Sequence, residues 1–502
     1  MPHTAGERAP KPQGARAPAR RTARTLLTAA AMAALVAAAN PLSGTPASEP
    51  QRGIGDPLFP GLGNPGYDVA AYDISFDYHG NDRPLDAVTT IDARATDWQR
   101  TLNLDFSHGT VRSVDVGGSP ARFATAGEDL VVTPARPVRP GEHLRITVRH
   151  TSDPRGGANG GWVRTRDGLA MANQADVAHQ VFPCNDHPSD KALFTFHVTA
   201  PKDLTVVANG LPAGRTTRGG ATTWTYTSAH PIATELTQVS IGRSAVLRRT
   251  GPHGLPVRDV VPAADRKWLG KRLARTTEQL AWLEGKVGRY PFETYGVLIA
   301  DANTGFELET QTLSLFERRL FTDASAYPAW YVDSLMVHEL AHQWFGDSVS
   351  PRRWADVWLN ESHATWYEAL YAQEKAKKSL TARMRAAYAN SDAWRAAGGP
   401  PAAPKASAPG KKISIFRPIV YDGSALVLYA LRQEIGAPAF ARLERSWVAQ
   451  HRDSDASTAD FTALASRTAG RDLSGFLHPW LYGAKTPPMP GHPGWKAARK
   501  PA

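Results

Sequence analysis

The hydrophobic pattern of this chain changes its period once, near residue 263, and no other feature constrains the fold as strongly. Before that point, short alternating or β-branched runs such as Tyr72–Tyr78 recur between turn-forming residues. After it, apolar residues recur with helical spacing, first at Lys267–Lys286. Alternation favours strands and a 3.6-residue period favours helices. We therefore predict a multidomain protein, in which an N-terminal antiparallel β-sandwich or saddle domain (60–248) precedes a mainly helical domain (249–484). Further helical patterns cover Val332–Phe345, Ser362–Lys377, Ala425–Ile435 and Ala437–Gln450.

The positive charge of the chain is concentrated at its two ends. The formal net charge is +11, but residues 1–48 hold six basic residues against one acid, and residues 485–502 hold four basic residues and no acid. The body between them is therefore close to neutral. A nucleic-acid interface needs basic residues gathered on the folded surface. We expect no nucleic-acid partner, and we interpret residues 485–502 as a basic flexible tail.

Residues 1–48 have the pattern of a signal peptide followed by a flexible leader. The basic stretch Arg20–Arg24 precedes the apolar run Leu26–Ala39, and small residues follow that run. The apolar run is shorter than the ~18 to 20 residues that a transmembrane helix needs, and no longer run occurs elsewhere. We predict a secreted protein without stable membrane insertion after processing. Whether it uses the Sec or the twin-arginine (Tat) route stays open.

One helical segment carries the pattern of a metal site. Cys184 is the only cysteine, so metal ligands must come from histidine and carboxylate side chains. His338 and His342 lie four residues apart, on one face of a helix, and two imidazoles so placed can bind one metal ion. Glu361, at the start of the next helical pattern, can complete a His₂Glu site for one Zn²⁺ per chain. Glu339 is one residue off the ligand face and is suited to act as a base on a water molecule.

Several segments of the chain also match motifs of one known family. These segments are His338–Asp347, Trp358–Glu361, Pro183–Ala192, Tyr290–Phe292 and Asp472–Tyr482. Together they resemble the M1 family of zinc aminopeptidases, a gluzincin family, and in particular its short secreted bacterial members. The resemblance runs from about Tyr67 to Tyr482. It implies that residues 249–484 form a mainly helical, thermolysin-like α+β catalytic domain.

The resemblance also implies a site for the substrate's α-amine. Members of the family hold this amine with the Glu of a Gly-x-Met-Glu-Asn motif, which corresponds here to Phe306–Thr310 with Glu309 as the key carboxylate. The first and last motif positions differ, and Glu307 lies two residues away. On a strand both acids would face the same side, so the register between Glu309 and Glu307 stays open. Gln174 matches the family's Gln or Glu that helps to bind the amine or the first side chain.

The family further implies a catalytic tyrosine. Its Tyr-x-x-Gly-Ala motif corresponds to Tyr421–Ala425, although Ser424 stands where glycine is usual. In the family this phenol donates a hydrogen bond to the developing oxyanion, as Tyr421 is expected to do here.

These observations predict a zinc-dependent aminopeptidase acting on peptides with a free N-terminus. Two alternatives stay open at this point: an epoxide or other non-peptide hydrolase on the same scaffold, and a secreted binding protein with a structural zinc site. The preferred N-terminal residue and the oligomeric state do not follow from the sequence.

Overall fold

The computed structural model describes residues 52–155, 160–406 and 415–498. The predicted signal peptide and leader (1–48) lie outside the described residues, and so do residues 499–502. In the part of the chain that is described, no helix combines the length and the apolarity that a membrane span requires.

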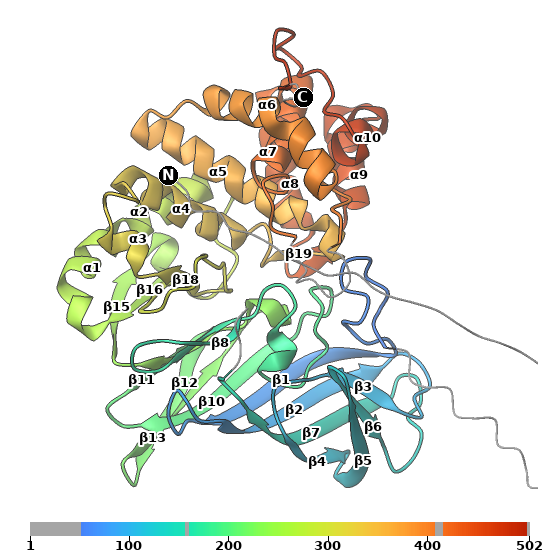
Figure 1. Ribbon diagram of the computed structural model, residues 1–502, viewed down its shortest axis with the longest axis vertical. Helices are drawn as coiled ribbons and strands as arrows, with labels where there is room; N and C mark the ends of the chain where they lie inside the picture. Colours follow the sequence, from blue (N-terminus) through green and yellow to red (C-terminus); the bar gives the residue numbers. More distant parts are fainter. Residues whose placement is uncertain (1–51, 156–159, 407–414, 499–502) are drawn as a thin grey trace, which may run out of the picture. The chain divides into compact units, whose positions relative to one another are not determined.

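The N-terminal domain is built on a ten-stranded sheet, here called the large sheet, with the order β12-β13-β10-β1-β2-β7-β4-β5-β6-β3. Figure 1 shows β1, β2 and β7 as neighbouring strands of this sheet. Its pairs are antiparallel, as predicted, except for β1 and β10, which run parallel. The strands are β1 Tyr67–Asp77, β2 Leu85–Ala95, β3 Leu102–Asp105, β4 Val111–Val116, β5 Ser119–Ala126, β6 Asp129–Thr133, β7 His143–Ser152, β10 Leu193–Pro201, β12 Leu211–Arg218 and β13 Ala221–Thr227.

Strand β1 illustrates how the alternating pattern forms this sheet. Tyr72, Ile74 and Phe76 point into the core, whereas the residues between them are more exposed. Tyr67 and Val69 are buried at the other end of the strand, in the opposite alternation. A register shift between Val69 and Ala71 accounts for this change, because one extra residue moves the following side chains to the other face.

A second, four-stranded sheet packs on the large sheet and completes a sandwich. Its order is β11-β14-β9-β8, and its core is shared with the large sheet. The rings of Phe76 on β1 and Trp162 on β8, for example, are 5.3 Å apart. The sandwich confirms the predicted fold class of this domain. The strands are β8 Gly161–Arg164, β9 Leu169–Ala172, β11 Thr205–Ala208 and β14 Val239–Gly242.

The second half of the chain begins with a mixed four-stranded sheet of order β15-β16-β17-β18. Strands β15 and β16 pair antiparallel, and β16, β17 and β18 are parallel. The predicted boundary at 248/249 falls inside β15, which pairs with β16 of this mixed sheet. The strands of the N-terminal sandwich therefore end with β14, and the mixed sheet begins with β15. The bounds are β15 Ser244–Thr250, β16 Pro256–Pro262, β17 Val297–Ala300 and β18 Ser314–Glu317; β19 Val349–Pro351 and β20 Ser454–Ala456 form a separate pair.

Helices make up most of the remaining chain, as predicted. They are α1 Arg266–Arg272, α2 Thr276–Val287, α3 Arg319–Thr322, α4 Ala329–His342, α5 Trp358–Ala376, α6 Leu380–Gly398, α7 Asp422–Ile435, α8 Ala437–Gln450, α9 Thr458–Ala469 and α10 Ser474–Tyr482. The predicted single helix at Lys267–Lys286 is divided into α1 and α2 by a 3₁₀ turn at Leu273–Arg275. Helices α4 and α5 pack side by side (Figure 1) and carry the metal-site residues.

The prediction of a flexible tail is wrong for residues 485–498. Met489 is buried, and Trp495 packs with its ring centroid 5.9 Å from that of Tyr429 on α7. His492 Nε2 lies 2.8 Å from the hydroxyl of the same tyrosine. The apolar surface of these side chains outweighs the tendency of the lysines and prolines around them to remain solvated.

Candidate active site

Helices α4 and α5 bring the three predicted metal ligands together. His338 and His342 lie one turn apart at the end of α4, and Glu361 lies in the first turn of α5. The Nε2 atoms of His338 and His342 are 3.4 and 3.5 Å from the same oxygen, Oε2 of Glu361. All three side chains are buried. One cation can therefore contact all three donors.

The second nitrogen of each imidazole has its own acceptor. His338 Nδ1 is 3.2 Å from Oε2 of Glu368, and His342 Nδ1 donates to the backbone oxygen of Phe345 at 3.1 Å. A proton held on Nδ1 leaves the Nε2 lone pair available to a metal, and such partners commonly fix ligand histidines. Glu361 and Glu368 are seven residues apart, two turns on one face of α5, so this helix contacts both nitrogens of His338.

The ionisation of Glu361, and its missing hydrogen bond in the described part of the chain, indicate that the donor set fits a metal. Its Oε2 is buried and accepts no hydrogen bond within the described residues, a costly situation for an anion. Burial alone would raise the pKa of Glu361, but the two imidazoles outweigh it and lower the pKa to about 2. An ionised oxygen facing two imidazole nitrogens matches the two-nitrogen, one-oxygen set that catalytic zinc uses.

Replacing Glu361 by alanine is expected to remove most of the bound metal, because two neutral imidazoles are left without the anionic ligand. Metal content after dialysis measures this, and circular dichroism checks the fold. The matched control is Glu374→Ala on the same helix, where the side chain is 39% exposed and pairs with Lys286. Stoichiometric metal in dialysed Glu361→Ala would contradict the ligand assignment.

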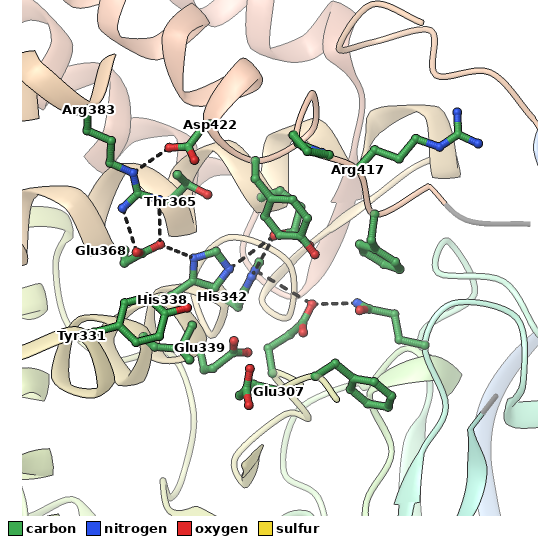
Figure 2. A pocket seen from close by; sticks show the side chains of 18 residues that line it. Glu307, Tyr331, His338, Glu339, His342, Thr365, Glu368, Arg383, Arg417 and Asp422 are labelled. Carbon is green, nitrogen blue, oxygen red and sulfur yellow. Dashed lines mark hydrogen bonds and ion pairs between the residues drawn. The ribbon is translucent and has the colours of Figure 1, made fainter. Parts of the chain in front are cut away.

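Beside the metal ligands lies a cavity of about 550 Å³, drawn in Figure 2. All seven predicted site residues line this cavity: Gln174, Glu309, His338, Glu339, His342, Glu361 and Tyr421. The structure thus brings together residues that are as many as 247 positions apart in the chain.

Glu339, the predicted base, faces this cavity next to a second carboxylate. A carboxylate oxygen of Glu339, one of Glu309 and a nitrogen of His342 all lie within 4.8 Å of one another. Burial and the negative charge of Glu309 raise the pKa of Glu339 above its usual value, although the positive charge of His338 acts to lower it. A carboxylate whose pKa is raised is suited to accept and return a proton near neutral pH.

The two predicted amine-binding residues contact each other across the domain boundary. Gln174, which follows β9 of the N-terminal domain, donates from Nε2 to Oε1 of Glu309 at 2.7 Å. Glu309 is 3% exposed, and its Oε1 is also 3.9 Å from Nδ1 of His342. This carboxylate therefore lies close to the metal ligands, with one oxygen held by the amide.

Glu307, the alternative in the register question, lines the same cavity as Glu309. Both acids thus face one side, as expected for positions two apart in an extended segment. The two differ in their surroundings: Glu309 is held by Gln174, whereas Glu307 is only partly buried and has no hydrogen bond or ion pair with another side chain in the described part of the chain. Burial and the Glu317 carboxylate raise the pKa of Glu307 to about 7.

Gln343, which the sequence did not indicate, ties the Glu309 segment to the end of α4. Its Nε2 donates to the backbone oxygen of Glu309 at 2.9 Å and to Oδ2 of Asp347 at 2.7 Å. Its Oε1 accepts from the backbone amide of Thr312 at 2.8 Å and from the hydroxyl of Tyr290 at 3.0 Å. Gln343 therefore fixes the segment around Glu309 relative to helix α4.

Tyr421 lies at the start of α7, with its ring centroid 6.1 Å from that of His338. Burial raises the pKa of its phenol well above the usual value, and the charges of Glu361 and Glu309 raise it further. The phenol therefore keeps its proton at neutral pH and can donate a hydrogen bond into the cavity.

A charged network outside the predicted set joins Tyr421 to the metal ligands. Arg383 on α6 contacts Oε1 of Glu368 at 2.7 Å and Oδ1 of Asp422 at 2.6 Å (Figure 2). Glu368 in turn holds His338, and Asp422 follows Tyr421 in the chain. The spacing of Glu368 from Glu361 could have indicated its place on the same helix face. No local signal indicated Arg383, because its contact depends on the packing of α6 against α7.

A His₂Glu cluster on two packed helices, with a glutamate following the first histidine, defines the gluzincin class. Within it, two family models match this chain: the peptidase family M1 domain over residues 272–480, and the peptidase M1 N-terminal domain over residues 71–236. The chain belongs to peptidase family M1.

Relatives of known name or structure agree with this assignment. Aminopeptidase N of Streptomyces lividans is 28% identical over 61% of this chain and 36% of its own length. A crystal structure of an M1 zinc metallopeptidase from Deinococcus radiodurans has a TM-score of 0.74 and 28% identity, over 88% of this chain and 99% of that one. A variant of that enzyme bound to a Tyr-Ser-Ala substrate has a TM-score of 0.72 and 29% identity, over 88% and 100%. The chain spans about a third to a half of the curated relatives it matches.

Proposed function

We propose that this protein is a zinc-dependent aminopeptidase that removes N-terminal residues from peptides. The observation that carries the proposal is the position of Glu309. A buried carboxylate, held by Gln174, lies 3.9 Å from a histidine of the metal cluster. A free α-amine bound there would bring the first peptide bond of the substrate beside the three side chains that would hold the metal. A charge-assisted hydrogen bond to the ammonium group supplies the attraction.

Zinc is the metal that this site is proposed to hold, with His338, His342 and Glu361 as ligands. When bound, zinc acts as a Lewis acid that polarises a carbonyl oxygen and acidifies water. The donor set supports this choice, and so does the buried Glu361 oxygen, which accepts no hydrogen bond from any residue that the structure describes. The zinc metallopeptidase structures of the relatives also support it.

The chain's own side chains supply the remaining chemistry. Glu309 and Gln174 hold the α-amine and orient the first peptide carbonyl. Glu339 accepts a proton from the attacking water and then returns it to the leaving amine. The Tyr421 phenol donates a hydrogen bond to the scissile carbonyl oxygen as that oxygen gains negative charge.

The two alternatives left open by the sequence are not favoured. A structural zinc site has no need for Glu339 beside a cavity, and the amine-holding pair Gln174 and Glu309 would have no purpose in epoxide hydrolysis. Hydrolysis of a leucyl arylamide that stops with a chelator and returns with zinc is the direct test. No turnover on any aminoacyl arylamide would overturn the proposed function.

Replacing Glu309 by alanine is expected to raise KM sharply for free-amine substrates, because the partner of the ammonium group is lost. N-Acetylation removes the positive charge of the substrate's amine, so the wild type should reject N-acetylated substrates. The difference in KM between free-amine and N-acetylated substrates should be smaller in the variant. Paired assays of leucyl and N-acetylleucyl arylamides measure this. The control is Glu278→Ala, an exposed carboxylate on α2 that pairs with Lys375. A larger loss from Glu307→Ala than from Glu309→Ala would place the amine at Glu307.

A further inference from the structure

Glu307 is an acidic side chain on the wall of the active-site cavity for which the mechanism above has no use. Figure 2 shows it pointing into the cavity, as Glu339 does. Among the described residues, no arginine or lysine pairs with it, whereas Arg383 on the same wall is already occupied by Glu368 and Asp422. A carboxylate that is partly withdrawn from water and lacks a partner is available to a cation on the substrate.

The direction of the bound peptide follows from helix α4. This helix presents Tyr331, Leu335, His338 and His342 to the cavity, spaced over about 16 Å at 1.5 Å per residue. Glu309 lies at the His342 end. With the amine held there and the scissile bond at the metal ligands, the part of the peptide that leaves must extend toward Leu335 and Tyr331.

Glu307 lies along this leaving side. Gln343, immediately after the end of α4, bonds to the backbone of Glu309 and of Thr312, so the segment from Thr312 back to Glu307 leads away from this end of the helix. Glu307 lines the cavity together with Leu335 and Tyr331 of the same helix. Glu309 and Glu307 thus flank the metal ligands, one toward the substrate's amine and the other toward its leaving part.

The spacing matches the second residue of the peptide. Glu307 and Glu309 lie two positions apart and line the same cavity, and two positions of an extended chain span about 6.6 Å. In an extended bound peptide the Cα atom of the second residue lies about 3.8 Å beyond that of the first, and a long side chain on the second residue covers the rest of this span. A substrate whose amine is bound at Glu309 therefore brings its second side chain to Glu307.

We propose that Glu307 selects peptides with lysine or arginine as the second residue, immediately after the scissile bond. The cationic end pairs with the Glu307 carboxylate, and the methylene stem lies along Leu335 and Tyr331. This specificity rests on the proposed aminopeptidase function and names the class of peptide that the same site prefers.

The test compares three tripeptides, Leu-Lys-Ala, Leu-Met-Ala and Leu-Glu-Ala, at pH 8, above the raised pKa of Glu307. Methionine matches the length of lysine without its charge. For the wild type, kcat/KM should be about tenfold higher with lysine than with methionine, the effect of about one hydrogen bond to a charged group, and lowest with glutamate. The ratio within each variant is the readout, so a general loss of activity does not affect it.

Glu307→Gln should bring the lysine-to-methionine ratio close to one, and Glu307→Lys should favour Leu-Glu-Ala. Glu278→Gln, the same loss of charge on the surface of α2, should keep the wild-type ratio. Equal turnover of the three peptides by the wild type, or a preserved ratio in Glu307→Gln, would overturn the proposal. So would a wild-type preference for Leu-Glu-Ala, which would assign the selection to Arg417 on the same cavity wall. Turnover of leucyl arylamide separates these outcomes from a failure of the proposed function.

Discussion

Glu339→Gln is expected to keep its zinc and to lose on the order of 10² to 10⁴-fold in kcat, the usual effect of losing a general base. Glutamine preserves the size and the burial of the side chain, but it cannot accept a proton. His338, His342 and Glu361 are unchanged, so the metal should stay. Metal content and kcat for a leucyl arylamide, measured on the same preparation, distinguish a general base from a metal ligand.

Glu235→Gln is the matched control for this variant. Glu235 is as deeply buried as Glu339, and burial together with the nearby Glu309 charge raises its pKa well above the usual value. Glutamine keeps the size of this side chain, and Glu235 does not line the cavity, so the exchange should leave activity close to that of the wild type. A Glu339→Gln protein that is folded but has lost its zinc would show that Glu339 is a ligand rather than a base.

The second large effect is expected from Tyr421→Phe. One lost donor to a developing oxyanion costs about 2.7 to 4 kcal/mol, or roughly 10² to 10³-fold in kcat. KM should change little, because the phenol is proposed to meet charge that exists only in the transition state. Steady-state kinetics on an aminoacyl arylamide gives both constants.

Tyr429→Phe controls for the loss of a hydroxyl from the same helix, since Tyr429 bonds to His492 and does not line the cavity. Its kcat should stay close to that of the wild type. An undiminished kcat in Tyr421→Phe, with a loss in Tyr331→Phe instead, would assign the donor role to the tyrosine of α4.

The residues that could be predicted from the sequence are those whose spacing alone fixes their geometry. His338 and His342 share a helix face at any position in a fold, and the alternation in β1 determines which side chains enter the core. The short strands β8, β9 and β14 carry no such signal. Residues of β9 and β14 are buried on both faces, so buried and exposed positions do not alternate.

Contacts between distant segments could not be predicted in the same way. Gln343 follows the second histidine, yet its four partners come from three separate parts of the chain. Arg383 acquires its role only when α6 packs beside α5 and α7. The composition of the C-terminal segment predicts a solvated tail, but Trp495 and His492 both contact Tyr429 on α7, and sequence spacing does not indicate this contact.

The hydrogen bonds of Gln343 have a consequence for the products. They hold the backbone at Glu309 against the helix of the metal ligands, so the separation between amine and scissile bond cannot grow by one residue without breaking buried bonds. Under the proposed function, each turnover shortens a peptide by a single residue and exposes a new amine of the same chemistry. A time course should therefore show a ladder of peptides, each one residue shorter than the last, with free amino acids and no dipeptides released from the N-terminus.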